Sequence, residues 1–285
     1  MSESTAELQQ PSLWKRVWSR PYGKISIVII LILVVTAIFA NLFSPFDPNG
    51  LDTENVFTRP GGGHLFGTDD LGRDLFSRVL FGGRIALTMA FCSAAIAMFV
   101  GVIWGFLAAQ FGGWIDEVLM RIVDAFLSIP IILLALIFIA ALGTKVGILA
   151  LVIGLILAPA TARLARSAVL SELQLDYCHA ATVVGVSRFR ILFGEVLPNT
   201  MPVLLARAVI CAADAIIIEA SLSFVGLGIN PPRASWGSLV RTGYEQLFNG
   251  YWLVLFPAIV ILLAIWSFNT LGDQIMEVLD PRMDS

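Results

Sequence analysis

Six long apolar runs, separated by shorter polar segments, dominate the pattern of this chain. The runs with few or no charged residues are residues 25–43, 85–111, 125–142, 146–162, 200–225 and 251–271. Each is near the ~20 residues that a helix needs to cross a bilayer. We therefore predict an all-α membrane protein with six transmembrane helices.

The fifth run differs from the others because charged residues interrupt it, among them Asp214 and Glu219. Charged side chains at bilayer depth usually face a protein interior or a wet cavity. Both are therefore candidates for lining a translocation pathway. The alternative is hydrogen bonding to neighbouring helices, and for Glu219 a role in holding the next turn together. Five positions on a helix correspond to about 140°, so the two need not share a face.

Basic residues set the predicted orientation. They cluster before the first run and between the fourth and fifth, at Lys15, Arg16, Arg20, Lys24, Arg163, Arg166, Arg188 and Arg190. The positive-inside rule places both segments in the cytoplasm. We expect a cytoplasmic segment 1–24, a first helix 25–43, an extracytoplasmic segment 44–83, a five-helix core 84–272 and a cytoplasmic tail 273–285. The loop 163–198 and both termini are then cytoplasmic.

Composition supports a membrane protein and narrows its chemistry. The chain is 58% hydrophobic and 14% charged, with mean hydropathy +0.86, whereas a soluble domain has about 25% charged residues. A net charge of −3 argues against nucleic acid as a partner. The three cysteines lack ligand-like spacing, and His64 and His179 are isolated. We expect no metal site and no cofactor in this chain.

The cytoplasmic segment around residue 180 has the features of a short surface helix. Asp176 can cap its start, and Ala180-Ala181 gives it a low-profile face that another protein can approach closely. Gly185 suits a left-handed C-terminal cap, Ser187 can cap a second helical stretch, and Pro198 fits the first turn of the fifth span. These features alone would equally fit an ordinary amphipathic loop.

A family resemblance decides between these alternatives. Ala180-Ala181, three residues, Gly185, nine residues and then x-x-Leu197-Pro198 resembles the signature loop of ABC importer permeases, whose short helix docks into a groove of the ATPase subunit. Two positions depart from that pattern: His179 stands where an acid is common, and Glu195 where an aliphatic residue is. The resemblance assigns ATPase coupling to Asp176, Tyr177, His179, Ala180, Ala181, Gly185, Arg188, Leu197 and Pro198.

Other segments are similar to one subfamily, the C-type permease of dipeptide, oligopeptide and nickel importers. They are residues 66–78, Gly82-Gly83-Arg84, residues 222–232, Ser235-Trp236-Gly237, residues 269–273 and residues 279–281. The resemblance implies the type I ABC importer permease fold in a bacterial or archaeal cytoplasmic membrane. It also implies a homologous B-type permease, two ATP-binding subunits that hold ATP and Mg, an extracytoplasmic binding protein and contact with membrane lipid. Peptides are the expected cargo, with nickel chelates and other small solutes as alternatives.

The extracytoplasmic segment has two expected features. Arg59-Pro60 and three glycines indicate turns, and residues 69–80 have helical spacing. Asp69, Asp70, Arg73 and Asp74 could contact the binding protein, or equally pair with one another at helical spacing. By the same reasoning, Arg121 and Asp124 are expected to pair within one helix.

Two other classes of function fit the sequence less well. A stand-alone secondary transporter predicts broken spans paired between two related halves, and no such symmetry is visible. An intramembrane metalloprotease would need His-Glu-x-x-His, and a serine protease a serine with a histidine at membrane depth, yet both histidines lie outside the runs. The phosphate-binding sequence Gly-x-x-x-x-Gly-Lys-Ser/Thr is also missing, so ATP hydrolysis is expected in other subunits.

Overall fold

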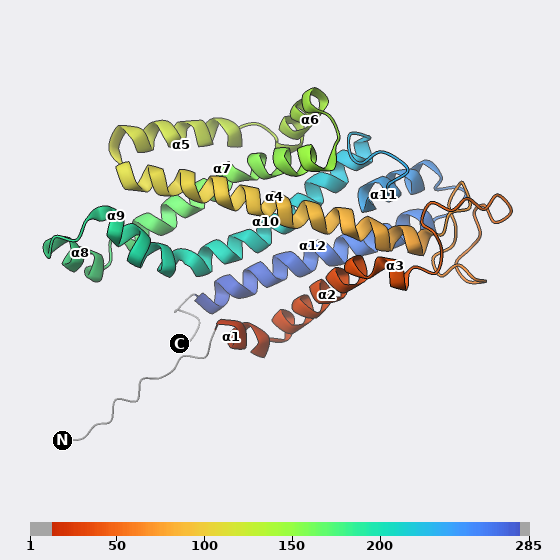
Figure 1. Cartoon of the computed structure of the whole chain (residues 1–285), viewed down its shortest axis with the longest axis horizontal. Coiled ribbons are helices and arrows are strands. Elements are labelled where there is room, and N and C mark those ends of the chain that lie inside the picture. Colours follow the sequence, from red (N-terminus) through yellow and green to blue (C-terminus); the bar gives the residue numbers. More distant parts are fainter. Residues whose placement is uncertain (1–12, 280–285) are drawn as a thin grey trace, which may run out of the picture.

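The structure is a computed structural model that describes residues 13–279, and its elements are helices (Figure 1). In chain order they are α1 Leu13–Ser19, α2 Pro21–Ile38, α3 Ala40–Phe43, α4 Leu75–Phe111, α5 Gly113–Leu127, α6 Ile131–Leu142, α7 Val146–Glu172, α8 Asp176–Val183, α9 Arg188–Ile191, the π-helical turn η1 Leu192–Val196, α10 Leu197–Val225, α11 Trp236–Glu245 and α12 Trp252–Leu279. The long helices run roughly side by side, with α8 at one end and the irregular segment before α4 at the other.

The span count agrees with the prediction, with one correction. Within residues 13–279, five helices are long and apolar enough to cross a membrane, and the bent pair α5 and α6 makes a sixth if counted as one span. A continuous third helix from residue 125 to 142 was the wrong prediction, because the chain bends by 88° between Leu127 and Ile131. Pro130 lies in this break, where it lacks an amide donor and disfavours helical backbone at Ile129.

The start of α4 also differs from the prediction. Helical spacing suggested a helix from residue 69, but α4 begins at Leu75. Asp74 is its N-cap and accepts a hydrogen bond from the Ser77 amide at 2.8 Å. Gly72 has a φ of 73°, a left-handed conformation that ends any helical path through this segment.

The centre of the molecule is a close pair of helices, α4 and α7. Small residues allow their backbones to approach: an ideal Cβ added at Gly105 would lie 2.4 Å from the Ala162 carbonyl oxygen. At Gly101 it would lie 2.7 Å from the Ala158 carbonyl oxygen. Membrane helices associate through such packing rather than through the hydrophobic effect, so this close approach holds the pair together.

Ion pairs attach α5 to α7. Arg166 makes a two-pronged contact with Asp116, with both N–O distances at 2.5 Å. Asp124 pairs with Arg163 of α7. The predicted pairing of Arg121 with Asp124 is therefore wrong, and Arg121 instead lies 3.9 Å from Glu117 one turn before it. Asp116 and Asp124 thus bind another helix, which spacing along one helix does not reveal.

The short helix α1 packs against the ends of α10 and α12. Val17 is buried in a cluster with Ala206 of α10 and with Leu271 and Ile275 of α12. Arg20, which directly precedes α2, forms an ion pair with Glu277. The two ends of the described chain thus lie together (Figure 1).

Candidate functional site

The helix α8 has the capped end that the sequence predicts. Gly185 has a φ of 86°, which confirms the left-handed cap. The Val186 amide donates to the Ala181 carbonyl, and the Gly185 amide donates to the Thr182 carbonyl, each at 3.0 Å. These two bonds are the Schellman arrangement, which satisfies carbonyls left free at the end of a helix.

Of the two predicted N-terminal caps, the one at α9 is confirmed and the one at α8 is wrong. Ser187 accepts a hydrogen bond from the Arg190 amide at 3.4 Å, which confirms the predicted cap of α9. The predicted cap by Asp176 is wrong: Leu175 occupies the N-cap position, and no side chain caps this end. Asp176 instead lies in the first turn, where its charge interacts favourably with the helix dipole.

The face that α8 turns away from the protein mixes polar and apolar side chains. Asp176, His179 and Thr182 are exposed beside Ala180, and Val183 and Val184 are 87% and 82% exposed. The two alanines of the motif differ in their surroundings: Ala180 is exposed, whereas Ala181 packs against a cluster that includes Phe106 of α4. One side of α8 is therefore anchored to the spans, and the other leaves valine side chains open to a partner.

Tyr177 fixes α8 to two spans at once. Its hydroxyl donates to Oε1 of Glu172 at 2.5 Å, at the end of α7, and accepts from Nδ2 of Asn199 at 3.0 Å, in the first turn of α10. Burial and the bond to Glu172 raise the pKa of Tyr177, so the phenol stays protonated at physiological pH. Tyr177 therefore links α8 to both helices.

The other predicted coupling residues link the loop to the membrane helices. Arg188 donates from Nη2 to the Ala109 carbonyl at 3.0 Å, near the end of α4. Leu197 packs against the same apolar cluster as Ala181, and Pro198 is exposed in the first turn of α10, as expected. The loop thus contacts α4, α7 and α10.

The two acidic residues of the fifth span have different surroundings. Asp214 lies 3.6 Å from Nη1 of Arg207 and is partly exposed. Glu219 is fully buried and accepts a hydrogen bond from Oγ of Ser223 at 2.7 Å. Ser235, just before α11, donates to Oγ of Ser223 at 3.1 Å. This geometry favours the role of Glu219 in holding the turn after α10 over one in lining a pathway.

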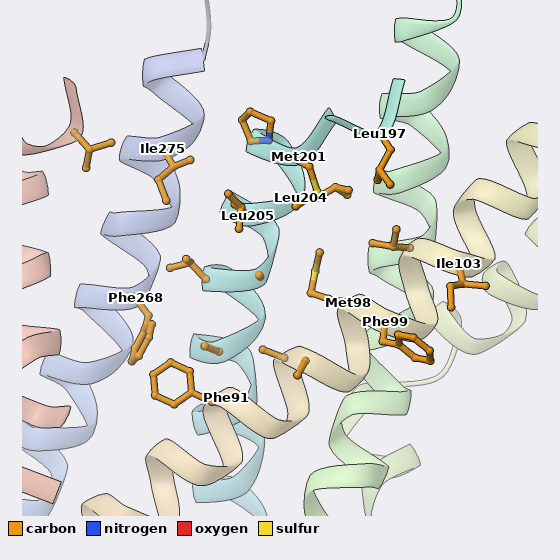
Figure 2. Close-up of a pocket in the computed structure, with 18 residues that line it drawn as sticks. Phe91, Met98, Phe99, Ile103, Leu197, Met201, Leu204, Leu205, Phe268 and Ile275 are labelled. Carbon is orange, nitrogen blue, oxygen red and sulfur yellow. The ribbon is translucent and has the colours of Figure 1, made fainter. Parts of the chain in front are cut away.

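An apolar pocket of about 650 Å³ opens between α4, α10 and α12. Figure 2 shows Met98, Phe99 and Ile103 of α4 on one side and Phe268 and Ile275 of α12 on the other, with α10 between them. Its lining residues are all uncharged, and Asp214 and Glu219 do not belong to it. Such a lining suits an acyl chain or an apolar side chain rather than a charged solute.

The four candidate contact residues for a binding protein lie close together but differ in exposure; they are Asp69, Asp70, Arg73 and Asp74. Asp69 and Asp74 are buried. Asp69 accepts from Nε of Arg73 at 2.7 Å, and Asp74 contacts Nδ1 of His64 at 2.9 Å. Asp70 is the most exposed of the four, with 34% of its side chain accessible. If this segment contacts a binding protein, Asp70 is the residue best placed to do so.

Sequence reasoning missed three residues of this arrangement. Glu172 and Asn199 hold Tyr177, yet neither belongs to a motif and each lies more than four residues from it in sequence. Arg207 is a further charged residue that interrupts the fifth apolar run, and its spacing of seven from Asp214 places both on one helical face. That spacing is the one signal that could have identified the pair.

Comparison with known proteins agrees with this geometry. Residues 101–285 match the family of binding-protein-dependent transport system inner membrane components. The chain belongs to this family. Residues 12–60 additionally match the N-terminal transmembrane domain of oligopeptide transport permease C. The predicted ABC importer permease is therefore confirmed, as is its location in a membrane.

Individual relatives cover nearly the whole chain. A probable D,D-dipeptide transport system permease protein of Escherichia coli is 37% identical over 94% of this chain and 91% of its own length. An oligopeptide transport system permease protein of Bacillus subtilis is 34% identical over 95% of this chain and 90% of its own.

A solved structure supports the fold. An inward-facing form of the MetNI methionine ABC transporter matches with a TM-score of 0.56 at 21% identity, covering 72% of this chain and 95% of that one. The permease has the fold of that chain, which confirms the predicted type I importer architecture.

Proposed function

We propose that this permease forms half of a pathway that imports short peptides, driven by ATP hydrolysis in separate subunits. The observation that carries the proposal is the outward face of α8, where Val183 and Val184 stand exposed beside Ala180. Exposed apolar side chains on a small, well-anchored helix fit a groove on a partner protein. The proposed partner at this face is an ATP-binding subunit, which supplies ATP and Mg.

The complete assembly would contain this chain, a homologous B-type permease, two ATP-binding subunits and an extracytoplasmic binding protein. The end of the molecule that carries α8 would face the cytoplasm. Arg163, Arg188 and Arg190 belong to this end, in agreement with the positive-inside rule. Because α1 and the end of α12 lie toward the same end (Figure 1), both termini would be cytoplasmic.

Peptide cargo is proposed from the relatives, whose names refer to D,D-dipeptides and oligopeptides. Nickel chelates are the alternative cargo. The test uses proteoliposomes that contain the complete complex, with the binding protein outside and ATP at the ATPase side. We expect uptake of labelled dialanine that requires ATP. Uptake of a nickel–histidine chelate in its place would favour the alternative cargo.

A variant tests the role of α8. Changing both Val183 and Val184 to Asp should reduce ATP-driven uptake at least tenfold, because two charges would be buried in the contact. The control is Gln174→Asp, which adds one charge at an exposed position just before α8. Normal uptake by the double variant would refute the docking surface. Uptake by this chain without ATP-binding subunits would instead support a secondary transporter.

A further inference from the structure

The middle of α10 carries a pair of opposite charges whose side chains make only a long contact with each other. Cys211 is the central residue of this 29-residue helix, and Arg207 and Asp214 lie about one turn before and after it. If α10 crosses the bilayer, the pair lies near the midplane. Charges at this depth are costly and usually mark a solute or ion pathway.

The contact between the two side chains is longer than the ion pair that attaches α5 to α7. Nη1 of Arg207 and Oδ2 of Asp214 are 3.6 Å apart, whereas Arg166 and Asp116 approach to 2.5 Å. Arg207 donates one hydrogen bond, from Nε to Oγ1 of Thr161 at 3.4 Å. An arginine has five N–H donors, so most of its capacity remains available.

The pair also lies on an accessible face of α10. Asp214 and Arg207 have 34% and 16% of their side chains exposed, while Ala213 and Ala215 beside Asp214 are buried. Ser221 lies a further seven residues along and is half-buried. The spacing of seven between Arg207, Asp214 and Ser221 makes a polar stripe along one face of the helix.

We propose that Arg207 and Asp214 bind the two charged ends of a zwitterionic solute as it passes through the membrane. This inference rests on the proposed function, and the solute class it names is a short peptide with free termini. The guanidinium would bind the carboxylate with two parallel hydrogen bonds, and the aspartate would bind the ammonium group. Each charge keeps a partner when the solute replaces the internal contact, so the exchange avoids leaving an unpaired charge.

The size of the pair fits a small peptide. Two extended residues span about 7 Å, and a hydrogen bond of about 2.8 Å at each end brings the separation that the two groups need to about 12–13 Å. The side chains, which are 3.6 Å apart in the internal contact, must therefore swing apart to bind a dipeptide, and the rise of about 10.5 Å between residues seven apart on a helix allows it. The apolar pocket beside α10 is a different site, since Arg207 and Asp214 do not line it.

The test measures binding of labelled dialanine to the purified four-subunit complex without its binding protein, so that only the membrane site reports. N-acetyl-dialanine and dialanine amide each lack one terminal charge. We expect each blocked peptide to bind the wild-type complex at least tenfold more weakly than free dialanine. No binding of dialanine, or equal affinities for all three peptides, would overturn the proposal.

Variants then assign each end of the peptide. In Asp214→Asn, N-acetylation should no longer reduce the affinity for the peptide, while amidation still reduces it. In Arg207→Gln, amidation should no longer reduce the affinity, while N-acetylation still does. Asp124→Asn, which removes a carboxylate that is also paired with an arginine, should leave both penalties unchanged. An equal loss of affinity for all three peptides in both α10 variants would indicate a structural role only, and would overturn the proposal.

Failure of the proposed function has a different signature. In that case the wild-type complex, with binding protein and ATP, would not take up dialanine at all. Uptake that proceeds while the peptides bind without regard to their terminal charges would refute only the site. If a variant fails to assemble, the three peptides on the wild-type complex still decide the result.

Discussion

The close contact of α4 and α7 predicts a large effect of a single methyl group. In the variant Gly105→Ala, the new Cβ would lie 2.4 Å from the Ala162 carbonyl oxygen and 2.8 Å from the Ala165 Cβ. Separations below 3.0 Å between such atoms force the helices apart. Overpacking of this kind costs about 1–3 kcal/mol, and we expect about 2 kcal/mol here because the obstacle is backbone.

A matched control separates this cost from helix propensity. Gly147 is also helical, in α7, but an added Cβ there meets nothing within 4 Å. Ala is more favourable than Gly in a helix interior by up to about 1 kcal/mol, and this preference favours the Ala variant at both positions. Gly147→Ala should therefore be neutral or stabilising, and Gly105→Ala should be less stable than it by about 2 kcal/mol.

The assay is thermal unfolding in mild detergent, followed by reaction of a thiol-specific dye with Cys178 and Cys211, which are buried in the folded protein. Exposed Cys92 is first replaced by Ala so that it does not react before unfolding. A difference of about 2 kcal/mol corresponds to a Tm lower by about 4–8 °C for a chain of this size. Equal Tm values for the two variants would refute the close packing of α4 on α7.

Four further predictions concern the loop that carries α8 and the end of α10. Tyr177→Phe removes hydrogen bonds to Glu172 and Asn199, worth about 1 kcal/mol each. The number of dialanine molecules transported per ATP in proteoliposomes should therefore fall severalfold. An unchanged number would contradict the role of Tyr177 in linking α8 to α7 and α10. Because the pKa of Tyr177 is raised, its ionisation should not alter coupling below about pH 10. Gly185→Val forces a branched residue to a φ of 86°, at a cost of about 1–2 kcal/mol, and should weaken co-purification of the ATP-binding subunits more than Gly194→Val does. Glu219→Lys would bury a cation at a fully buried position and should abolish accumulation in the membrane on an immunoblot, whereas Glu219→Gln keeps an acceptor for Ser223 and should accumulate normally.

The sequence predicted those features that depend on near neighbours. The apolar runs predicted the spans, because hydropathy over about 20 residues is a local property. Gly185 and Ser187 predicted their caps, since a cap is set by residues within one turn. The family motif located α8, although it did not reveal that Ala180 faces outward while Ala181 packs inward.

Features that depend on distant residues were missed or predicted wrongly. Asp124 pairs with Arg163 across two helices, while local spacing suggested Arg121. Pro130 marks a place where the third span can kink, but apolar residues continue on both sides of it, so hydropathy does not show how sharply the chain bends. Asp69 was assigned to a helix from its charge spacing, yet the backbone at Gly72 turns away from a helical path.

The continuity of the segment from α9 through α10 has a mechanical consequence. Residues 188–225 form one helical segment of 38 residues, about 57 Å long at 1.5 Å per residue. If this segment tilts as one rigid body at the end that carries α9, every residue along it moves in proportion to its distance from the pivot. The π-helical turn Leu192–Val196 interrupts the regular α-helical hydrogen bonding of this segment. The stiffness of that single turn would then set how much of each ATP-driven stroke reaches the middle of the membrane.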